Sequence, residues 1–294
     1  MVRHAEAASP TALEAAYARC AAIARGHYEN FTVASLFFPR HLLPFLFAIY
    51  AFCRHTDDLG DEASGDRLAL LDAWEADLDR CLSGTPEHPV LLALGDTIRR
   101  FDMPDTPFRK LIEANRMDQR QARFATYADL LRYCDHSANP VGHMVLYVLG
   151  DRTAESQRLS DATCTALQLA NFWQDVRRDY EKGRIYLPME DMARFGCGEA
   201  EIRDGVASNA FRDLLRFEVE RTRRLFEEGL PLISRLRGRA RLDVALFSKG
   251  GLSVLDAIRR QRYDVLHRRP TVSRGRKAWL LASTAARLLA LGRP

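Results

Sequence analysis

The sequence has few cysteines, and no two of them form a closely spaced pair. Such spacing argues against a structural zinc site and against a framework of disulfides. Several of the cysteines stand among apolar residues, which is typical of small core side chains, and a reducing cytosol is the compartment that this usage favours. The 294 residues contain six: Cys20, Cys53, Cys81, Cys134, Cys164 and Cys197.

Long hydrophobic runs are also missing. No stretch of about 18 apolar residues is present, and the first residues lack an apolar core, so we expect neither a membrane span nor a signal peptide. The nearest approach is residues 277–291, which are rich in Leu and Ala and contain Arg287. Two interpretations stay open: a basic amphipathic helix on a membrane surface, or a helix packed on the body of the protein. We predict a cytoplasmic protein and leave contact with the inner membrane face open.

Strand-like alternation, internal repeats and a glycine-rich nucleotide loop are absent as well. Apolar residues recur instead at three- and four-residue steps, as at Leu68, Leu71 and Trp74, among abundant Ala, Leu, Arg and Glu. This pattern predicts an all-α chain. We expect one domain over residues 1–294 with a basic tail at about 270–294, and helix breaks at Gly and Pro positions that include Ser83–Pro86 and Gly250-Gly251.

Charge is spread unevenly along the chain. The net charge is +4, but residues 203–294 contain 21 Lys and Arg against 9 Asp and Glu. A basic surplus of this kind suits nucleic acid, anionic lipid or a phosphorylated substrate. We do not expect nucleic acid as a partner, because the sequence has no zinc pattern and no aromatic RNA-binding motif.

Two acidic clusters stand out, at residues 54–62 and 171–179. In each, carboxylate or amide oxygens recur every four residues, which places them on one face of a helix. Solvated helices carry such pairs too, but like charges at this spacing repel, and Mg²⁺ would offset the repulsion because it takes oxygen ligands. Two such faces across a cleft would bind a diphosphate. The positions are Asp57 and Asp61, then Asn171, Asp175 and Asp179.

The surroundings of the clusters strengthen this interpretation. Both follow apolar runs, at residues 45–53 and 167–173, and an unpartnered carboxylate is costly to bury. Arg54 lies three residues before Asp57, where it can meet a phosphate or a carboxylate. Residues 42–52 and 141–149 are apolar nearly all round, as in the middle of a bundle. A bundle with two acid-bearing helices suits a long apolar ligand with a charged head, such as an isoprenoid diphosphate.

These segments together resemble the squalene and phytoene synthase family, the head-to-head trans-isoprenyl diphosphate synthases. The matching segments span most of the chain: 27–31 with Pro39, 48–62, 133–134 with 141–142, 168–179 and 183–188. The resemblance implies an all-α isoprenoid-synthase helical bundle around a central apolar cavity. It also implies Mg²⁺ ions that bridge both acidic motifs to the diphosphate of the substrate.

The resemblance also assigns roles to individual residues. It makes Asp57, Asp61, Asn171, Asp175 and Asp179 magnesium ligands or their immediate support, with Asp58 in the same motif but on another side of the helix. It places Arg54, His27, Asn30 and Phe31 against the substrate's diphosphate. It places Tyr50, Tyr133 and Gln168 along the reaction cavity, although ordinary core packing with a satisfied polar tip explains these three equally well.

Three departures from the condensing members of the family narrow the assignment. Residues 28–31 replace a Ser-x-Ser-Phe segment, Gln174 replaces an arginine before Asp175, and Gly251-Leu252 replace a Tyr-Arg pair. The loss of an arginine that helps to bind diphosphate suggests a site that no longer handles two prenyl diphosphates at once. With residues 137–142, these features resemble the hydroxysqualene synthase branch of bacterial hopanoid and squalene biosynthesis.

This branch implies a reaction without NADPH. Presqualene diphosphate would lose its diphosphate and capture water to give hydroxysqualene, which agrees with the missing nucleotide loop. Asn30, Tyr133 and Gln168 are the candidates for placing the water. Two alternatives remain: a condensing synthase that makes presqualene diphosphate, squalene or phytoene, and a non-catalytic assembly factor, which the retained aspartates disfavour. Association with other enzymes of the squalene pathway is left open.

Overall fold

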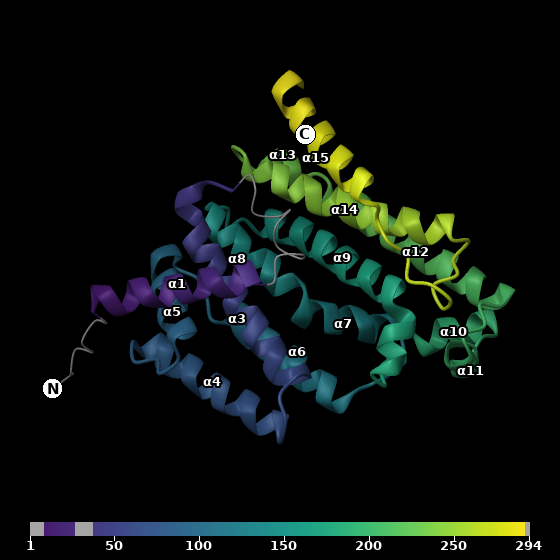
Figure 1. Ribbon diagram of the computed structural model, residues 1–294, viewed down its shortest axis with the longest axis horizontal. Helices are drawn as coiled ribbons and strands as arrows, with labels where there is room; N and C mark the ends of the chain where they lie inside the picture. The colour runs from purple at the N-terminus through teal and green to yellow at the C-terminus, as the bar shows by residue number, and fades with distance from the viewer. Residues whose placement is uncertain (1–8, 27–37, 292–294) are drawn as a thin grey trace. The chain divides into compact units, whose positions relative to one another are not determined.

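The computed structural model describes residues 9–26 and 38–291, and within them it is helical (Figure 1). His27, Asn30 and Phe31 lie outside the described residues. The all-α prediction is confirmed: the described residues hold no strand, only an isolated bridge between Arg123 and Ile185. The helices are α1 Pro10–Gly26, η1 Arg40–Leu42, α3 Leu43–Asp61, α4 Arg67–Ser83, α5 Pro89–Phe101, α6 Thr106–Arg120, α7 Tyr127–Ser137, α8 Asn139–Leu149, α9 Ala154–Glu181, α10 Met189–Phe195, α11 Glu199–Asp204, α12 Asn209–Gly229, α13 Leu232–Arg235, α14 Ala240–Arg260 and α15 Arg274–Leu291.

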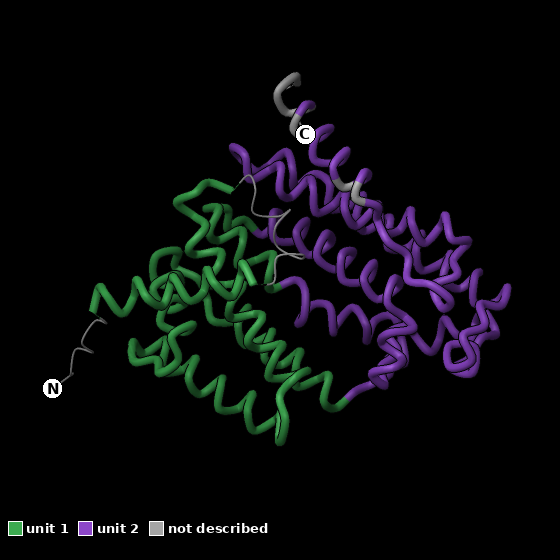
Figure 2. The backbone as a smooth tube through the Cα atoms, viewed as in Figure 1, with its two compact units in different colours: residues 1–120, 140–153 green, residues 121–139, 154–294 purple. Residues whose placement is uncertain are grey.

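The chain forms two compact units (Figure 2). Residues 1–120 and 140–153 make unit 1, and residues 121–139 and 154–294 make unit 2. The first acidic motif belongs to unit 1 and the second to unit 2. The prediction of a single domain with a basic tail stays a prediction.

Unit 1 is built around α3, which packs against α1, α4, α5 and α6. Its Leu46, Ile49 and Phe52 are buried, as expected for a helix that is apolar on nearly every side. The Phe52 ring stacks on Trp74 at 5.6 Å between centroids and meets the edge of Phe108 at 5.4 Å. These contacts fix the helix whose last two turns carry the first acidic motif.

Unit 2 is built around the 28-residue helix α9, which packs against α7, α11, α12, α13 and α14. Small residues let α12 approach closely, because a Cβ atom on Gly229 would lie 2.1 Å from Thr163 Oγ1. Trp173 is fully buried at the same interface, and its indole N–H donates to Thr222 Oγ1 at 2.8 Å. The second acidic motif is thus held on a helix with buried partners along much of its length.

The predicted helix break at Gly250-Gly251 is wrong, because α14 continues through both residues. The reason is the packing of α14 on α9 and α12: a Cβ atom on Gly251 would lie 2.2 Å from Phe226 Cζ and 2.9 Å from Leu167 Cδ2. Gly251 therefore serves close approach between helices and not chain reversal. The break predicted at Ser83–Pro86 is confirmed, because α4 ends there on Gly84 with φ +92°.

Helix α15 packs on α14 through Leu280 and Thr284, both of which are buried. Of the two interpretations left open for this helix, packing on the body of the protein describes one of its faces. Its Trp279 is 54% exposed on another face. None of the described helices is long and apolar enough to cross a membrane.

Candidate active site

The first acidic motif occupies the last two turns of α3. Asp57, Asp58 and Asp61 lie at the carboxyl end of the helix, and its last turn contains no basic residue. Backbone carbonyls give that end a partial negative charge, so aspartates there destabilise the helix. Asp57 and Asp61 are exposed to solvent. The three aspartates therefore destabilise the end of α3 when they are alone, and a bound cation would offset this effect.

Helix α6 orients Asp57 from the neighbouring side. Gly60 lies so close to Asn115 that a Cβ atom on the glycine would be 2.1 Å from Asn115 Oδ1. This approach lets Asn115 Nδ2 donate to Asp57 Oδ1 at 3.3 Å, and it lets Gln119 Nε2 donate to the Gly60 carbonyl at 2.9 Å. Because Gly60 has no side chain, Asn115 comes close enough to orient the Asp57 carboxylate one turn away.

The environment disfavours the charged form of Asp57. Solvent reaches the side chain, but the protein atoms crowded around it reduce its hydration, and this raises the pKa of the carboxyl to about 6. The nearby Asp61 carboxylate raises the pKa further, while the hydrogen bond from Asn115 and the charge of Arg54 lower it. A cation between Asp57 and Asp61 would relieve this repulsion.

Arg54 contacts other carboxylates of the same helix end. Its Nη2 lies 2.5 Å from Asp58 Oδ1 and 2.7 Å from Glu62 Oε1. Its charge is therefore shared with Asp58, which lies one turn further along α3. The half-buried Tyr50 lies one turn before Arg54, so Tyr50, Arg54, Asp57 and Asp61 recur at three- and four-residue steps on one face.

The second acidic motif lies at the carboxyl end of α9, and its central residue is bound to an arginine that the sequence analysis missed. Arg269 clamps Asp175 with both arms of its guanidinium: Nε lies 2.5 Å from Oδ1 and Nη2 lies 2.7 Å from Oδ2. Asp175 is only 9% exposed. This bidentate pair raises the pKa of Arg269.

Gln174 takes part in the same arrangement. Its Oε1 accepts from Arg269 Nη2 at 3.1 Å, and its Nε2 donates to the Pro270 carbonyl at 2.5 Å. Position 174 holds a neutral amide, yet a guanidinium still lies beside Asp175, supplied by Arg269. The only sequence signal was the basic pair Arg268-Arg269 before Pro270, in a region without helical periodicity.

The remaining predicted residues of α9 are spaced as expected for one face of the helix. Asn171 is exposed, whereas Gln168 and Asp179 are half-buried, and the motif positions recur at one-turn steps. Within the described residues, no group of three or more His, Cys, Asp and Glu side chains is arranged to hold a metal ion by itself. Mg²⁺ is usually held by one or two carboxylates together with water and substrate phosphates, so paired oxygen ligands such as Asp57 and Asp61 fit this ion.

Tyr133 lies in an aromatic cluster of unit 2. It is 4% exposed, and its ring centroid is 5.4 Å from that of Phe124 and 5.8 Å from that of Tyr186. Tyr186 in turn stacks on Phe172 of α9 at 3.8 Å. The segment that carries Tyr186 is held by Arg123, which donates to the Gly183 carbonyl at 2.6 Å. The cluster therefore fixes the turn that follows the second acidic motif.

Solved structures with similar folds define the class of this protein. A squalene synthase, HpnC, from Alicyclobacillus acidocaldarius matches with a TM-score of 0.84 and 47% identity, over 87% of this chain and 97% of that one. A dehydrosqualene synthase in complex with ligand matches with a TM-score of 0.86 and 28% identity, over 95% and 99% of the two chains. The all-α chain thus has the fold of the helical isoprenoid synthases.

The sequence comparisons identify the family within that class. The squalene/phytoene synthase profile matches residues 6–276. A 15-cis-phytoene synthase of Synechococcus elongatus is 35% identical over 279 residues, which cover 90% of this chain and 91% of that protein. The chain belongs to the squalene/phytoene synthase family, and it is an enzyme of isoprenoid biosynthesis.

Proposed function

We propose that this protein converts presqualene diphosphate into hydroxysqualene, with Mg²⁺ and without NADPH. Gln174 carries the proposal: the position that holds an arginine in condensing members is here a neutral amide bonded to Arg269 and to the Pro270 carbonyl. Arg269 supplies the guanidinium that contacts Asp175 directly, and Arg178 lies farther away, with Nη1 3.8 Å from Asp175 Oδ1. A site without the arginine at position 174 is suited to one diphosphate and not to two.

Two further observations support the same branch. The tyrosine that condensing members carry at position 251 would not fit here, because Phe226 already occupies the space beside Gly251. The chain is also 47% identical to the squalene synthase HpnC but 35% identical to the phytoene synthase of Synechococcus elongatus.

In this proposal the acidic motifs bind the substrate's diphosphate through the metal. Asp57 and Asp61 supply carboxylate oxygens from α3, and Asn171 and Asp179 supply oxygens from α9. Asp175 belongs to the same set and is held in place by Arg269. Bound Mg²⁺ would act as a Lewis acid that stabilises the negative charge of the departing diphosphate. Arg54 adds positive charge at the end of α3.

The reaction balances with water as the only co-substrate. The carbon–oxygen bond to diphosphate breaks, and both electrons leave with the diphosphate. The carbocation that remains rearranges and forms a new carbon–oxygen bond with water, which then loses a proton. Aromatic faces stabilise positive charge in an apolar site, and Tyr50 and Tyr133 are the proposed aromatic residues. Gln168 and Asn30 are the proposed partners of the water.

Product analysis tests the proposal directly. We would incubate the purified protein with Mg²⁺ and either presqualene diphosphate, farnesyl diphosphate or geranylgeranyl diphosphate, without NADPH. Mass spectrometry should find hydroxysqualene from the first substrate and no product from the other two. The variant Asp61→Asn should retain the helical circular dichroism spectrum and lose diphosphate release. Normal turnover by that variant would refute the role of the first motif.

The second candidate is a condensing synthase of the phytoene type. The 35% identity to a 15-cis-phytoene synthase favours it, as does the guanidinium that Arg269 restores beside Asp175. Consumption of farnesyl or geranylgeranyl diphosphate in the same assay would establish this activity.

A further inference from the structure

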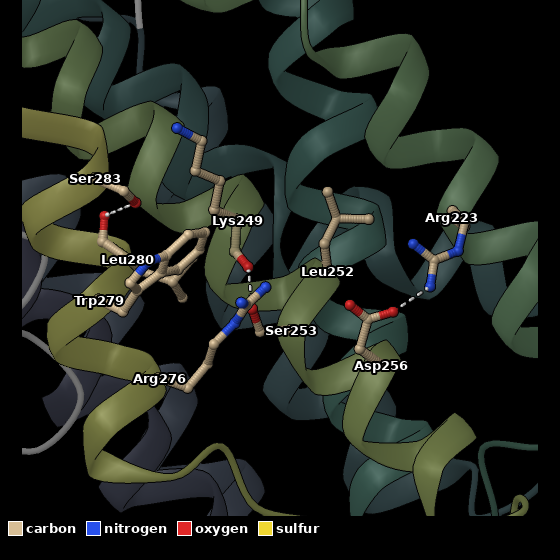
Figure 3. Close-up of a pocket in the computed structure, with 9 residues that line it drawn as sticks. All are labelled: Arg223, Lys249, Leu252, Ser253, Asp256, Arg276, Trp279, Leu280 and Ser283. Atoms are coloured by element: carbon tan, nitrogen blue, oxygen red, sulfur yellow. Dashed lines mark hydrogen bonds and ion pairs between the residues drawn. The ribbon is translucent and has the colours of Figure 1, made fainter. Parts of the chain in front are cut away.

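A cavity of about 250 Å³ lies between α12, α14 and α15 of unit 2, and no residue of either acidic motif lines it (Figure 3). Three cations line it, Arg223, Lys249 and Arg276, against one carboxylate, Asp256. Asp256 is already bound to Arg223 at 3.0 Å and to Arg259 at 3.2 Å. The cavity is therefore positively charged, and its one acidic group is occupied.

Arg276 shows directly that the cavity is suited to an oxygen acceptor. Its guanidinium lies over the Trp279 ring, with Cζ 4.5 Å from the centroid. Its Nε is buried and has no hydrogen-bond partner within the described part of the chain. A buried donor without a partner is destabilising, and an anionic oxygen would satisfy it. Lys249, whose ammonium donates to Thr284 Oγ1 at 3.1 Å, stands on the opposite wall.

Trp279 and the exposed residues of α15 indicate that the anion bound in the cavity belongs to a membrane surface. Trp279 is 54% exposed at the edge of the cavity, and Ala278 and Ala282 are exposed beside it. Residues 265–294 contain seven Lys and Arg and no Asp or Glu. Tryptophan together with basic residues is typical of a helix that lies in a membrane interface.

We propose that this cavity binds the phosphate of an anionic phospholipid and that α15 lies on the membrane surface with Trp279 in the interface. The cavity is smaller than the roughly 300–1,000 Å³ of sites for drug-sized ligands, so it holds a headgroup and leaves the acyl chains outside. The site is separate from the residues of the proposed reaction. It does not depend on which isoprenoid diphosphate the enzyme uses.

Tryptophan fluorescence measures this binding on the full chain. The protein has three tryptophans, and Trp74 and Trp173 are buried with bonded indole N–H groups. A blue shift on addition of vesicles therefore reports on Trp279. We expect the shift with equimolar phosphatidylglycerol and phosphatidylcholine but not with phosphatidylcholine alone. Co-sedimentation of the Trp279→Phe variant should confirm binding without the signal.

Charge variants distinguish the cavity from general attraction to a negative surface. Each basic residue near an anionic membrane contributes about a fivefold gain in affinity. Arg276→Gln should therefore weaken vesicle binding about fivefold. The double variant Arg276→Gln/Lys249→Gln should weaken it about 25-fold. Arg260→Gln removes the same charge from an exposed position of α14 outside the cavity, and it should change binding less than about twofold. Circular dichroism checks that each variant folds.

Three results would overturn the proposal. Equal binding to phosphatidylcholine vesicles would remove the role of the anion. An equal loss of vesicle affinity in Arg260→Gln and Arg276→Gln would mean that the protein is attracted to the negative surface in general and that the cavity is not a binding site. Inorganic phosphate that raises the melting temperature of the wild type but not of Arg276→Gln, with no vesicle binding, would make this a site for soluble phosphate.

Discussion

Arg269 is distant in sequence from the aspartate that it binds, and a single substitution measures what the contact contributes. Arg269→Gln leaves Asp175, which is 9% exposed, without its bidentate partner. We expect a loss of about 2 kcal/mol of unfolding free energy, since hydrogen bonds to charged groups contribute about 1.5–3 kcal/mol. Urea denaturation measures it.

A matched variant separates charge from geometry. Arg269→Lys keeps the positive charge but loses the planar fork that meets both oxygens of Asp175. It should lie between the wild type and Arg269→Gln in stability. If both variants unfold at the urea concentration of the wild type, the ion pair contributes nothing to the fold.

Asp57 links stability to pH in the metal-free protein. Its pKa is raised to about 6, above the roughly 3.9 of an unfolded aspartate. The stability that comes with the protonated form is therefore fully present below about pH 4 and is lost as the pH rises through 6. The loss is at most about 1 kcal/mol, because solvent reaches the side chain.

Asp57→Asn should abolish this pH dependence. In EDTA the variant should match the wild type at pH 4 and exceed its unfolding free energy at pH 8, by no more than about 1 kcal/mol. Catalysis should fall at least about a hundredfold, because the amide is a weaker ligand for a hard cation. A variant that is destabilised at pH 8 would contradict the raised pKa.

At the scale of the element, two adjacent glycines of α14 have opposite environments. A Cβ atom on Gly251 would collide with Phe226, whereas a Cβ atom on Gly250 would meet nothing within 4 Å. Gly251→Ala should destabilise the protein by about 1–3 kcal/mol through overpacking. Gly250→Ala should stabilise it by about 0.5–1 kcal/mol, because alanine loses less backbone entropy in a helix.

Thermal unfolding of the two variants compares them on one helix. A second substitution, Phe226→Leu, should restore part of the stability of Gly251→Ala, because it removes the atoms that the new methyl group meets. If Gly250→Ala and Gly251→Ala have the same melting temperature, the close contact between α12 and α14 does not determine the stability of this helix.

At the scale of the whole molecule, the proposed function assigns ligands of the diphosphate to both acidic motifs. Inorganic diphosphate with Mg²⁺ should therefore stabilise the whole chain, by about 2.7 kcal/mol at a hundred times the dissociation constant. This corresponds to a rise of about 4 °C in the melting temperature for a chain of this size. Differential scanning calorimetry measures it, and Mg²⁺ alone or diphosphate alone is the control.

The same experiment tests whether both motifs serve one ligand. Asp61→Asn in unit 1 and Asp179→Asn in unit 2 should each abolish the shift. A shift that persists in either variant would assign the diphosphate to the other motif by itself.

The sequence by itself determined the all-α class, the family and the two acidic helix ends, because these depend on local spacing. Periodicity of three and four residues predicts helices, and aspartates one turn apart share a face wherever the helix lies. The buried apolar surroundings of Phe52 and Trp173 followed from the same patterns. Motifs of this kind are legible without knowledge of what packs against them.

Only the tertiary structure decided the partners of these residues. Arg269 reaches Asp175 across 94 positions of sequence, and no local pattern encodes a contact made by chain reversal through an irregular segment. Gly251 looked like a helix break because glycine usually ends helices, whereas its neighbour Phe226 makes it a packing residue. The unpartnered Nε of Arg276 likewise depends on the packing of α15 against α14, since burial is a property of the assembled helices and not of the residue.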